Sequence, residues 1–256
     1  MRTFFRSEKY PALLVFLYLI VWVWAAIDPL DRADWWLENY LIFASVPVLV
    51  WSWMRFRLSN LSYTLIAVFL ALHTIGSHTA YSNAPIGFWL QEAFGLARNH
   101  YDRVVHFSFG LLLAYPVREV FLRLANARGV WGLWFPVELT LATSALYEIL
   151  EWLVAANVDP AAGIAFLGSQ GDVWDAQKDM ALAGLGALIA MGVTAFVRSG
   201  KDHEYRTELV ASVRPRGRPL GEQELARLDR KGTMMRIVRR PLPSAQARRL
   251  RSRKRA

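Results

Sequence analysis

Residues 101–121 read YDRVVHFSFGLLLAYPVREVF. The run is apolar over about the roughly 20 residues that a helix needs to cross the hydrocarbon core of a bilayer. Its beginning nevertheless carries Asp102 and His106, and ionisable side chains are rare in a spanning helix unless they have a partner or a function. The stretch therefore predicts a membrane-spanning helix that presents polar groups near one of its ends.

Further apolar runs of similar length occur on both sides of this stretch. They lie at residues 11–27, 36–54, 60–80, 130–155 and 180–197. The composition agrees, because 54% hydrophobic residues and 11 Trp are unusual in a soluble domain. We therefore predict an all-α polytopic membrane protein, a bundle of about six transmembrane helices. The first run follows a basic start, as a signal peptide does, but its length, its Trp residues and the Asp-rich turn after it favour an uncleaved span.

Charge divides the chain into two parts. Residues 1–197 hold 12 Lys and Arg against 15 Asp and Glu, whereas residues 198–256 hold 18 against 6. We predict a six-helix transmembrane domain over 1–197 and a basic, largely disordered tail over 198–256, because the tail has little apolar surface to bury. We expect the tail to contact anionic lipid head groups. Nucleic acid is not a favoured partner, since a basic run alone is weak support for it.

The basic residues of the body lie between alternate apolar runs. The N-terminal residues, Arg55 with Arg57, the segment 118–128 and the tail all fall on one side of the predicted bundle. The positive-inside rule places this side in the cytoplasm, together with both termini. The lipid bilayer is the expected surroundings. The chain contains no cysteine, which excludes disulfides and thiolate metal sites.

Ionisable groups gather at the opposite, outward end of the last three runs. Asp102 and His106 are four residues apart and share a helix face. Glu148 and Glu151 near the end of run 130–155 are also neighbours on one face. The approach to the last run adds a third group, in which the final residue opens the predicted helix: Asp172, Asp175 and Asp179.

Two histidines near the end of run 60–80 are weaker candidates for site residues. His73 and His78 are five residues apart, so on a continuous helix they point about 140° apart. They converge only if Gly76 ends or kinks the helix. Glu138 lies about 15 Å deeper than Glu148 along its helix, and the sequence identifies no partner for it.

Carboxylates this close together either bind protons or hold a cation. Oxygen donors with one or two imidazoles suit Mg²⁺, Mn²⁺ or Zn²⁺, and a bound ion would let an anionic lipid phosphate dock. The predicted metal ligands are Asp102, His106, Glu148, Asp172, Asp175 and Asp179. The predicted catalytic acid/base groups are Asp102, His106, Glu148 and Glu151.

Other interpretations of the same residues remain open. The acids could couple protons or cations in a transporter or channel, or only fix helix packing in a non-catalytic scaffold. Asp102 and Asp179 would also stabilise helix N-termini as first-turn carboxylates. The sequence does not decide whether the protein is an enzyme.

Several of these segments resemble the YjdF-like family of bacterial inner-membrane proteins. The resemblance covers about residues 10–197 and includes HTIGSHTAY at 73–81, the stretch 99–119, YEILEW at 147–152 and GDVWDAQKDMALAGLGALIA at 171–190. It implies an integral protein of the bacterial inner membrane and supplies no established biochemical role.

The last three predicted helices also resemble, more distantly, the VanZ family associated with glycopeptide resistance. Its pattern runs D-K-x-x-H-F, then E-x-x-Q, then D-x-x-D-x-x-x-N, and the matching residues here are Asp102, His106, Glu148, Asp172 and Asp175.

Three positions depart from that pattern. Arg103 stands in place of Lys, Glu151 in place of Gln and Asp179 in place of Asn, so this site is two charges more acidic. The departures favour a bound cation. The leading hypothesis is a polar, cation-linked site near the outer face that acts on or binds a lipid-linked or cell-envelope component.

Overall fold

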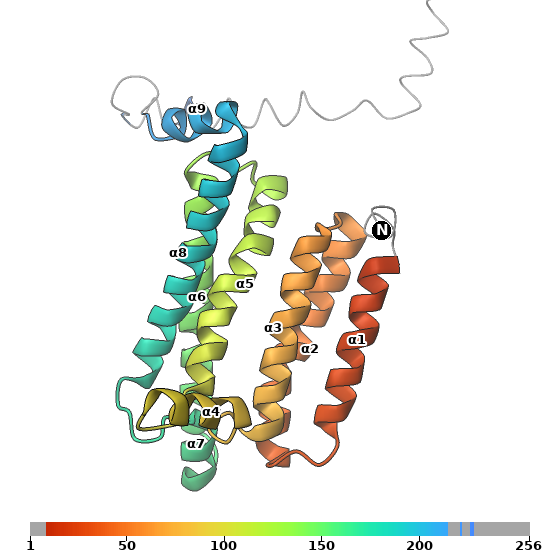
Figure 1. Cartoon of the computed structure of the whole chain (residues 1–256), viewed down its shortest axis with the longest axis vertical. Helices are drawn as coiled ribbons and strands as arrows, with labels where there is room; N and C mark the ends of the chain where they lie inside the picture. The colour runs from red at the N-terminus through yellow and green to blue at the C-terminus, as the bar shows by residue number, and fades with distance from the viewer. Residues whose placement is uncertain (1–8, 215–220, 222–225, 228–256) are drawn as a thin grey trace, which may run out of the picture. The chain divides into compact units, whose positions relative to one another are not determined.

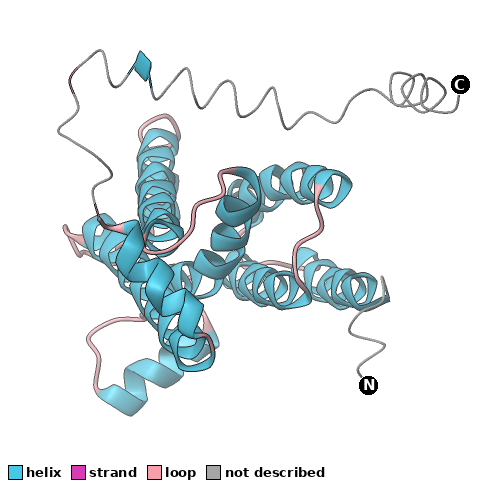
Figure 2. Cartoon of the chain, turned by 90° about the horizontal axis from the view of Figure 1, so that it is seen from above, coloured by secondary structure: helices cyan, strands magenta, loops and turns pink. Residues whose placement is uncertain are grey.

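The described residues of the computed structural model, 9–214, 221 and 226–227, form helices joined by loops (Figures 1 and 2). The long helices are α1 (Lys9–Ala26), α2 (Arg32–Arg55), α3 (Asn60–Thr79), α5 (Tyr101–Leu124), α6 (Trp131–Ala155) and α8 (Asp175–Lys201). The short helices are α4 (Pro85–Phe94), α7 (Pro160–Leu167) and α9 (His203–Ser212). The described part of the chain contains no strand, and the predicted all-α class is confirmed.

Five of these helices, α1, α2, α3, α5 and α8, are long and apolar enough to cross a membrane. Helix α6 has 25 residues but is not among them, because its sequence includes Glu138, Glu148 and Glu151. It packs against α5 and α8 and lies alongside them in Figure 1. Since α6 leads from the end of α5 to the opposite end of the bundle, where α8 begins, it crosses with them. The protein is a polytopic α-helical membrane protein.

The ends of α8 differ from the predicted span. The apolar run predicts residues 180–197, whereas α8 begins at Asp175 and ends at Lys201. Hydropathy marks the part of a helix that lies in hydrocarbon, while the polar turns at both ends continue the helical hydrogen bonding. The predicted domain boundary at residue 197 thus falls inside α8. Helix α9 follows at once, because Asp202 caps it by accepting from the backbone N–H groups of Glu204 and Tyr205.

The tail is described only over 198–214, 221 and 226–227. Its predicted disorder and its predicted contact with anionic head groups therefore lie outside the described residues for the most part. Within the described part of the tail, residues 198–201 belong to α8 and residues 203–212 form α9, so most of this part is helical.

Helices α5 and α8 approach each other through glycine. A Cβ on Gly110 would lie 1.8 Å from the carbonyl oxygen of Ala183, and one on Gly186 would lie 2.3 Å from that of Phe107. The two backbones are therefore in direct contact. This contact fixes the distance between the polar groups that the two helices carry near their N-termini.

The first three helices pack together and join the rest through α3 and α5. The Trp22 indole of α1 donates to Asn39 Oδ1 of α2 at 2.8 Å, and the Tyr18 hydroxyl lies 3.2 Å from that of Thr74 on α3. A cluster that includes Phe69 and Tyr101 forms the core between α3 and α5. Many large apolar side chains point outward instead, as lipid surroundings require.

Candidate functional site

His106 lies between carboxylates from three helices. Its Nε2 atom is 3.6 Å from Asp102 Oδ1 on α5 and 3.5 Å from Glu148 Oε1 on α6. Asp179 of α8 completes the group, because single donor atoms of Asp102, His106 and Asp179 all lie within 4.8 Å of one another. We call Asp102, His106, Glu148 and Asp179 the acidic cluster. The structure therefore brings together four of the six predicted metal ligands.

The acidic cluster is shielded from water. Asp179 is 2% exposed and His106 is 8% exposed. Glu148 Oε1 and Asp179 Oδ1 are buried without a hydrogen-bond partner among the described residues. Because leaving a buried carboxylate oxygen unpaired is costly, each of these atoms is suited to a proton or a cation.

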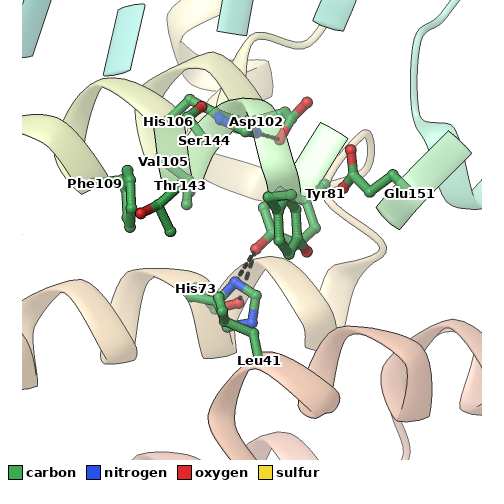
Figure 3. A pocket seen from close by; sticks show the side chains of 11 residues that line it. Leu41, His73, Tyr81, Asp102, Val105, His106, Phe109, Thr143, Ser144 and Glu151 are labelled. Carbon is green, nitrogen blue, oxygen red and sulfur yellow. Dashed lines mark hydrogen bonds and ion pairs between the residues drawn. The ribbon is translucent and has the colours of Figure 1, made fainter. Parts of the chain in front are cut away.

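A cavity of about 50 Å³ adjoins the acidic cluster (Figure 3). Asp102, His106 and Glu151 line one part of it, and His73 and Tyr81 line another. Small-molecule sites usually measure about 300–1,000 Å³, whereas one water needs only about 10–15 Å³. The cavity thus has room for an ion with a few waters and not for a lipid head group.

His73 is held by fixed hydrogen bonds on the far side of the cavity. Its Nε2 atom lies 3.1 Å from the backbone carbonyl of Glu38, so Nε2 carries the proton and donates it. Nδ1 of the neutral ring then accepts from the Tyr81 hydroxyl (Figure 3). Burial raises the pKa of Tyr81, in the loop after α3, well above its usual range, which keeps this donor protonated. Both nitrogens of His73 are occupied, and a metal has no lone pair to bind there.

The two histidines of α3 point apart. Helix α3 continues through Gly76 and ends at Thr79, so the condition for their convergence is not met. His78 instead donates from Nδ1 to the backbone carbonyl of Ala25 on α1 at 3.1 Å. The sequence-based angle of about 140° is in accord with this separation.

Asp172 and Asp175 lie in a second group, where they meet basic side chains. Asp175 Oδ1 is 2.5 Å from Arg98 Nη2 and 3.1 Å from Arg103 Nη2, while Asp172 Oδ2 is 2.6 Å from Lys178 Nζ. These ion pairs fasten the segment before α8 to the start of α5. We call these five residues the ion-pair group.

The ion-pair group keeps Asp172 charged. Hydrogen bonds from Lys178 and from the backbone of Trp174 hold the pKa of Asp172 well below its usual range. Burial and the nearby charges of Arg103 and Arg98 lower the pKa of His100, which precedes α5. The two acids predicted as metal ligands here form ion pairs with Arg and Lys, and Asp175 also acts electrostatically on Asp102 and Asp179.

Several polar residues near the cavity are not predicted as site residues. Tyr147 donates to Glu38 Oε2 at 2.9 Å, and Glu38 is 4% exposed although it lies within the apolar helix α2. An acid inside an apolar run is the sequence signal that could have identified Glu38. Glu138 does not join them: it is exposed on the bundle surface and accepts from the Trp134 indole at 2.6 Å.

The fold and the acidic cluster define a multipass α-helical membrane protein with ionisable groups enclosed among its helices. Residues 10–200 match the family described as "Predicted membrane protein (DUF2238)", and the chain belongs to this family. It is 38% identical over 170 residues to the Inner membrane protein YjdF of Escherichia coli (strain K12), which covers 66% of this chain and 81% of that protein. No solved structure matches the chain. The YjdF-like resemblance is confirmed, and the resemblance to VanZ stays a prediction.

Proposed function

We propose that this protein is a bacterial inner-membrane protein that binds a divalent cation in the acidic cluster and uses it to act on or hold a lipid-linked or cell-envelope component. The observation that carries the proposal is His106, whose Nε2 atom lies 3.6 Å and 3.5 Å from the carboxylates of Asp102 and Glu148. Asp179 adds a carboxylate from a third helix, α8. The name of the Escherichia coli relative supports the location.

The donor set suits Mg²⁺, Mn²⁺ or Zn²⁺. Opposite ligands around such ions are separated by about 4 Å, and the donors of Asp102, His106 and Asp179 lie within 4.8 Å of one another. Small side-chain rotations close that difference. Glu148 Oε1 provides a fourth donor that has no other partner among the described residues.

A bound cation would change what the site can recognise. Without it, the carboxylates repel phosphate; with it, the local field reverses and an anionic group can bind to the ion. Glu151, one helical turn from Glu148, lines the cavity, and in this proposal it transfers protons. Since the cavity is only about 50 Å³, a lipid-linked component would present its anionic group at the mouth and keep the rest in the bilayer.

Basic residues support an orientation for the bundle. The exposed side chains of Arg55, Arg123, Arg128 and Lys201 lie at the end opposite the acidic cluster. By the positive-inside rule this end faces the cytoplasm. The acidic cluster then lies near the outer face of the membrane, and the start of α1 and the end of α8 both lie on the cytoplasmic side.

Ion binding by the full chain tests the proposal. Purified protein in detergent is stripped with a chelator and titrated with Mn²⁺, Zn²⁺ and Mg²⁺ by calorimetry. We expect one ion per chain, and we expect Asp102→Asn and Asp179→Asn to weaken binding by at least about tenfold, because each removes a charged ligand. Glu92→Gln is the matched control, since this exposed acid of α4 lies outside the acidic cluster.

Two results would overturn the proposal. One is a wild-type protein that binds none of the three ions. The other is Asp102→Asn and Asp179→Asn variants that bind as tightly as the Glu92→Gln control.

A further inference from the structure

Arg118 is a buried cation near the other end of α5. It is 5% exposed and lies six residues before the last residue of the helix, which corresponds to about 9 Å. A charged side chain at such a depth in a membrane protein is costly unless an opposite charge meets it. Its surroundings therefore decide whether the charge is compensated.

The nearest acid in the sequence is already engaged. Glu119 accepts from the backbone N–H of Ser59 at 2.9 Å, from the Ser62 hydroxyl at 2.6 Å and from Arg123 at 2.6 Å. Among the described residues, no Asp or Glu forms an ion pair with Arg118. The protein itself does not neutralise this charge in the part of the chain that the structure describes.

The groups that act electrostatically on Arg118 are a second cation and two tyrosines, Tyr115 and Tyr205. Its electrostatic neighbours include Arg198 of α8 and Tyr205 of α9. The Arg198 guanidinium carbon lies 4.9 Å from the centre of the Tyr205 ring. Arg118 Nε is buried without a hydrogen-bond partner among the described residues, and the Tyr205 side chain lies within hydrogen-bonding reach of the Arg118 guanidinium group. Two guanidinium groups thus converge on one tyrosine hydroxyl, and within the described part of the chain no carboxylate forms an ion pair with Arg118.

Helix α9 holds this arrangement in place. Asp202 caps its first turn, and Ser212 at its end accepts from the backbone N–H of Val130 at 2.9 Å. Tyr205, between these two attachments, is 4% exposed. The position of Tyr205 beside Arg118 is therefore fixed by contacts at both ends of α9.

We propose that Arg118, Arg198 and Tyr205 bind the phosphate group of an anionic phospholipid where α5, α8 and α9 meet. Guanidinium groups donate paired hydrogen bonds to phosphate oxygens, and a tyrosine hydroxyl adds a third donor. An anion between the two arginines also removes their mutual repulsion. The ends of α5 and α8 lie where spanning helices reach the head-group region, which places lipid phosphate within reach.

Thermal unfolding of the full chain in detergent, followed by tryptophan fluorescence, tests this binding. The probes are mixed micelles with phosphatidylglycerol, mixed micelles with phosphatidylcholine, and inorganic phosphate. We expect phosphatidylglycerol to raise the unfolding midpoint by about 5 °C and the other two to have little effect. An equal shift with inorganic phosphate would support the phosphate site and identify the free ion as its source.

Variants distinguish this site from general attraction to basic residues. We expect Arg118→Gln and Arg198→Gln to lose the phosphatidylglycerol shift. Lys201→Gln, which removes one exposed positive charge from the end of α8, should keep it. Arg198 is exposed, so its variant gives a result even where Arg118→Gln does not fold. A phosphatidylglycerol shift of wild-type size in Arg198→Gln, or the absence of any shift in the wild type, would overturn the proposal.

Discussion

Single side chains around the cavity are held by groups from other segments of the chain. His73 of α3 donates to the backbone of α2 and accepts from Tyr81, which follows α3 in the chain. Glu38 of α2 accepts from Tyr147 of α6. The hydrogen bond between Tyr147 and Glu38 connects the first three helices to the half of the bundle that carries the acidic cluster.

Removing the Tyr81 hydroxyl should destabilise the protein. In Tyr81→Phe, the buried Nδ1 atom of His73 loses its donor, and an unsatisfied buried acceptor costs about 1–3 kcal/mol. Chemical unfolding in detergent measures the loss. The control is Tyr40→Phe, because Tyr40 is 66% exposed on α2. Equal stability of the two variants would show that the His73 hydrogen bond contributes nothing.

Spacing along a helix predicted part of the candidate site. Asp102 with His106 is a relationship within one helix, and helical periodicity gives it directly. The meeting of His106 with Glu148 and Asp179 depends on how α5, α6 and α8 pack, which periodicity does not give. The sequence indicated this meeting only because the acids of the three helices lie at a similar depth in the predicted bundle.

The pairing of Asp172 and Asp175 with basic side chains could not be predicted in the same way. Arg98 and Arg103 precede or begin α5, about 70 residues earlier, and only the packing of that segment against the start of α8 brings them to these acids. Charge counting placed acids and bases at the same end of the bundle. It could not predict which acid would form an ion pair with which base.

At the scale of elements, the contact between α5 and α8 sets the geometry of the acidic cluster. Hydropathy located the spans to within a few residues, since apolar length is a local property of the chain. It did not predict α4, α7 or α9 as helices, because these segments are short and lie between or after the spans.

Gly186→Ala should separate α5 from α8. The new methyl group would lie 2.3 Å from the Phe107 carbonyl oxygen and 2.7 Å from the Leu111 nitrogen, so one backbone must shift. Overpacking of this kind costs about 1–3 kcal/mol. We also expect weaker cation binding, because Asp179 moves away from Asp102 and His106. Unfolding and ion titration measure the two effects.

Gly192→Ala is the control on the same helix. A Cβ at Gly192 meets nothing within 4 Å, so the substitution should leave stability equal or slightly higher, as alanine favours helix formation. If both variants behave alike, the close contact between α5 and α8 does not determine stability.

At the scale of the whole molecule, the orientation of the bundle can be measured without background labelling, because the chain contains no cysteine. Asn157→Cys lies in the exposed loop between α6 and α7, and Ala125→Cys lies at the exposed end of α5. In intact spheroplasts, a thiol reagent that cannot cross membranes should label Asn157→Cys. It should reach Ala125→Cys only after the membrane is broken. Labelling of Ala125→Cys alone would reverse the proposed orientation.

The polarity of α6 has a consequence for biogenesis. With three glutamates, α6 falls short of the apolarity at which the other long helices of the described chain qualify as spans. A nascent helix leaves the translocon for lipid according to its own hydrophobicity, so α6 is poorly suited to enter the bilayer by itself. We therefore expect its integration to depend on packing against α5 and α8, so that a chain arrested before residue 175 inserts α6 less completely than the full chain does.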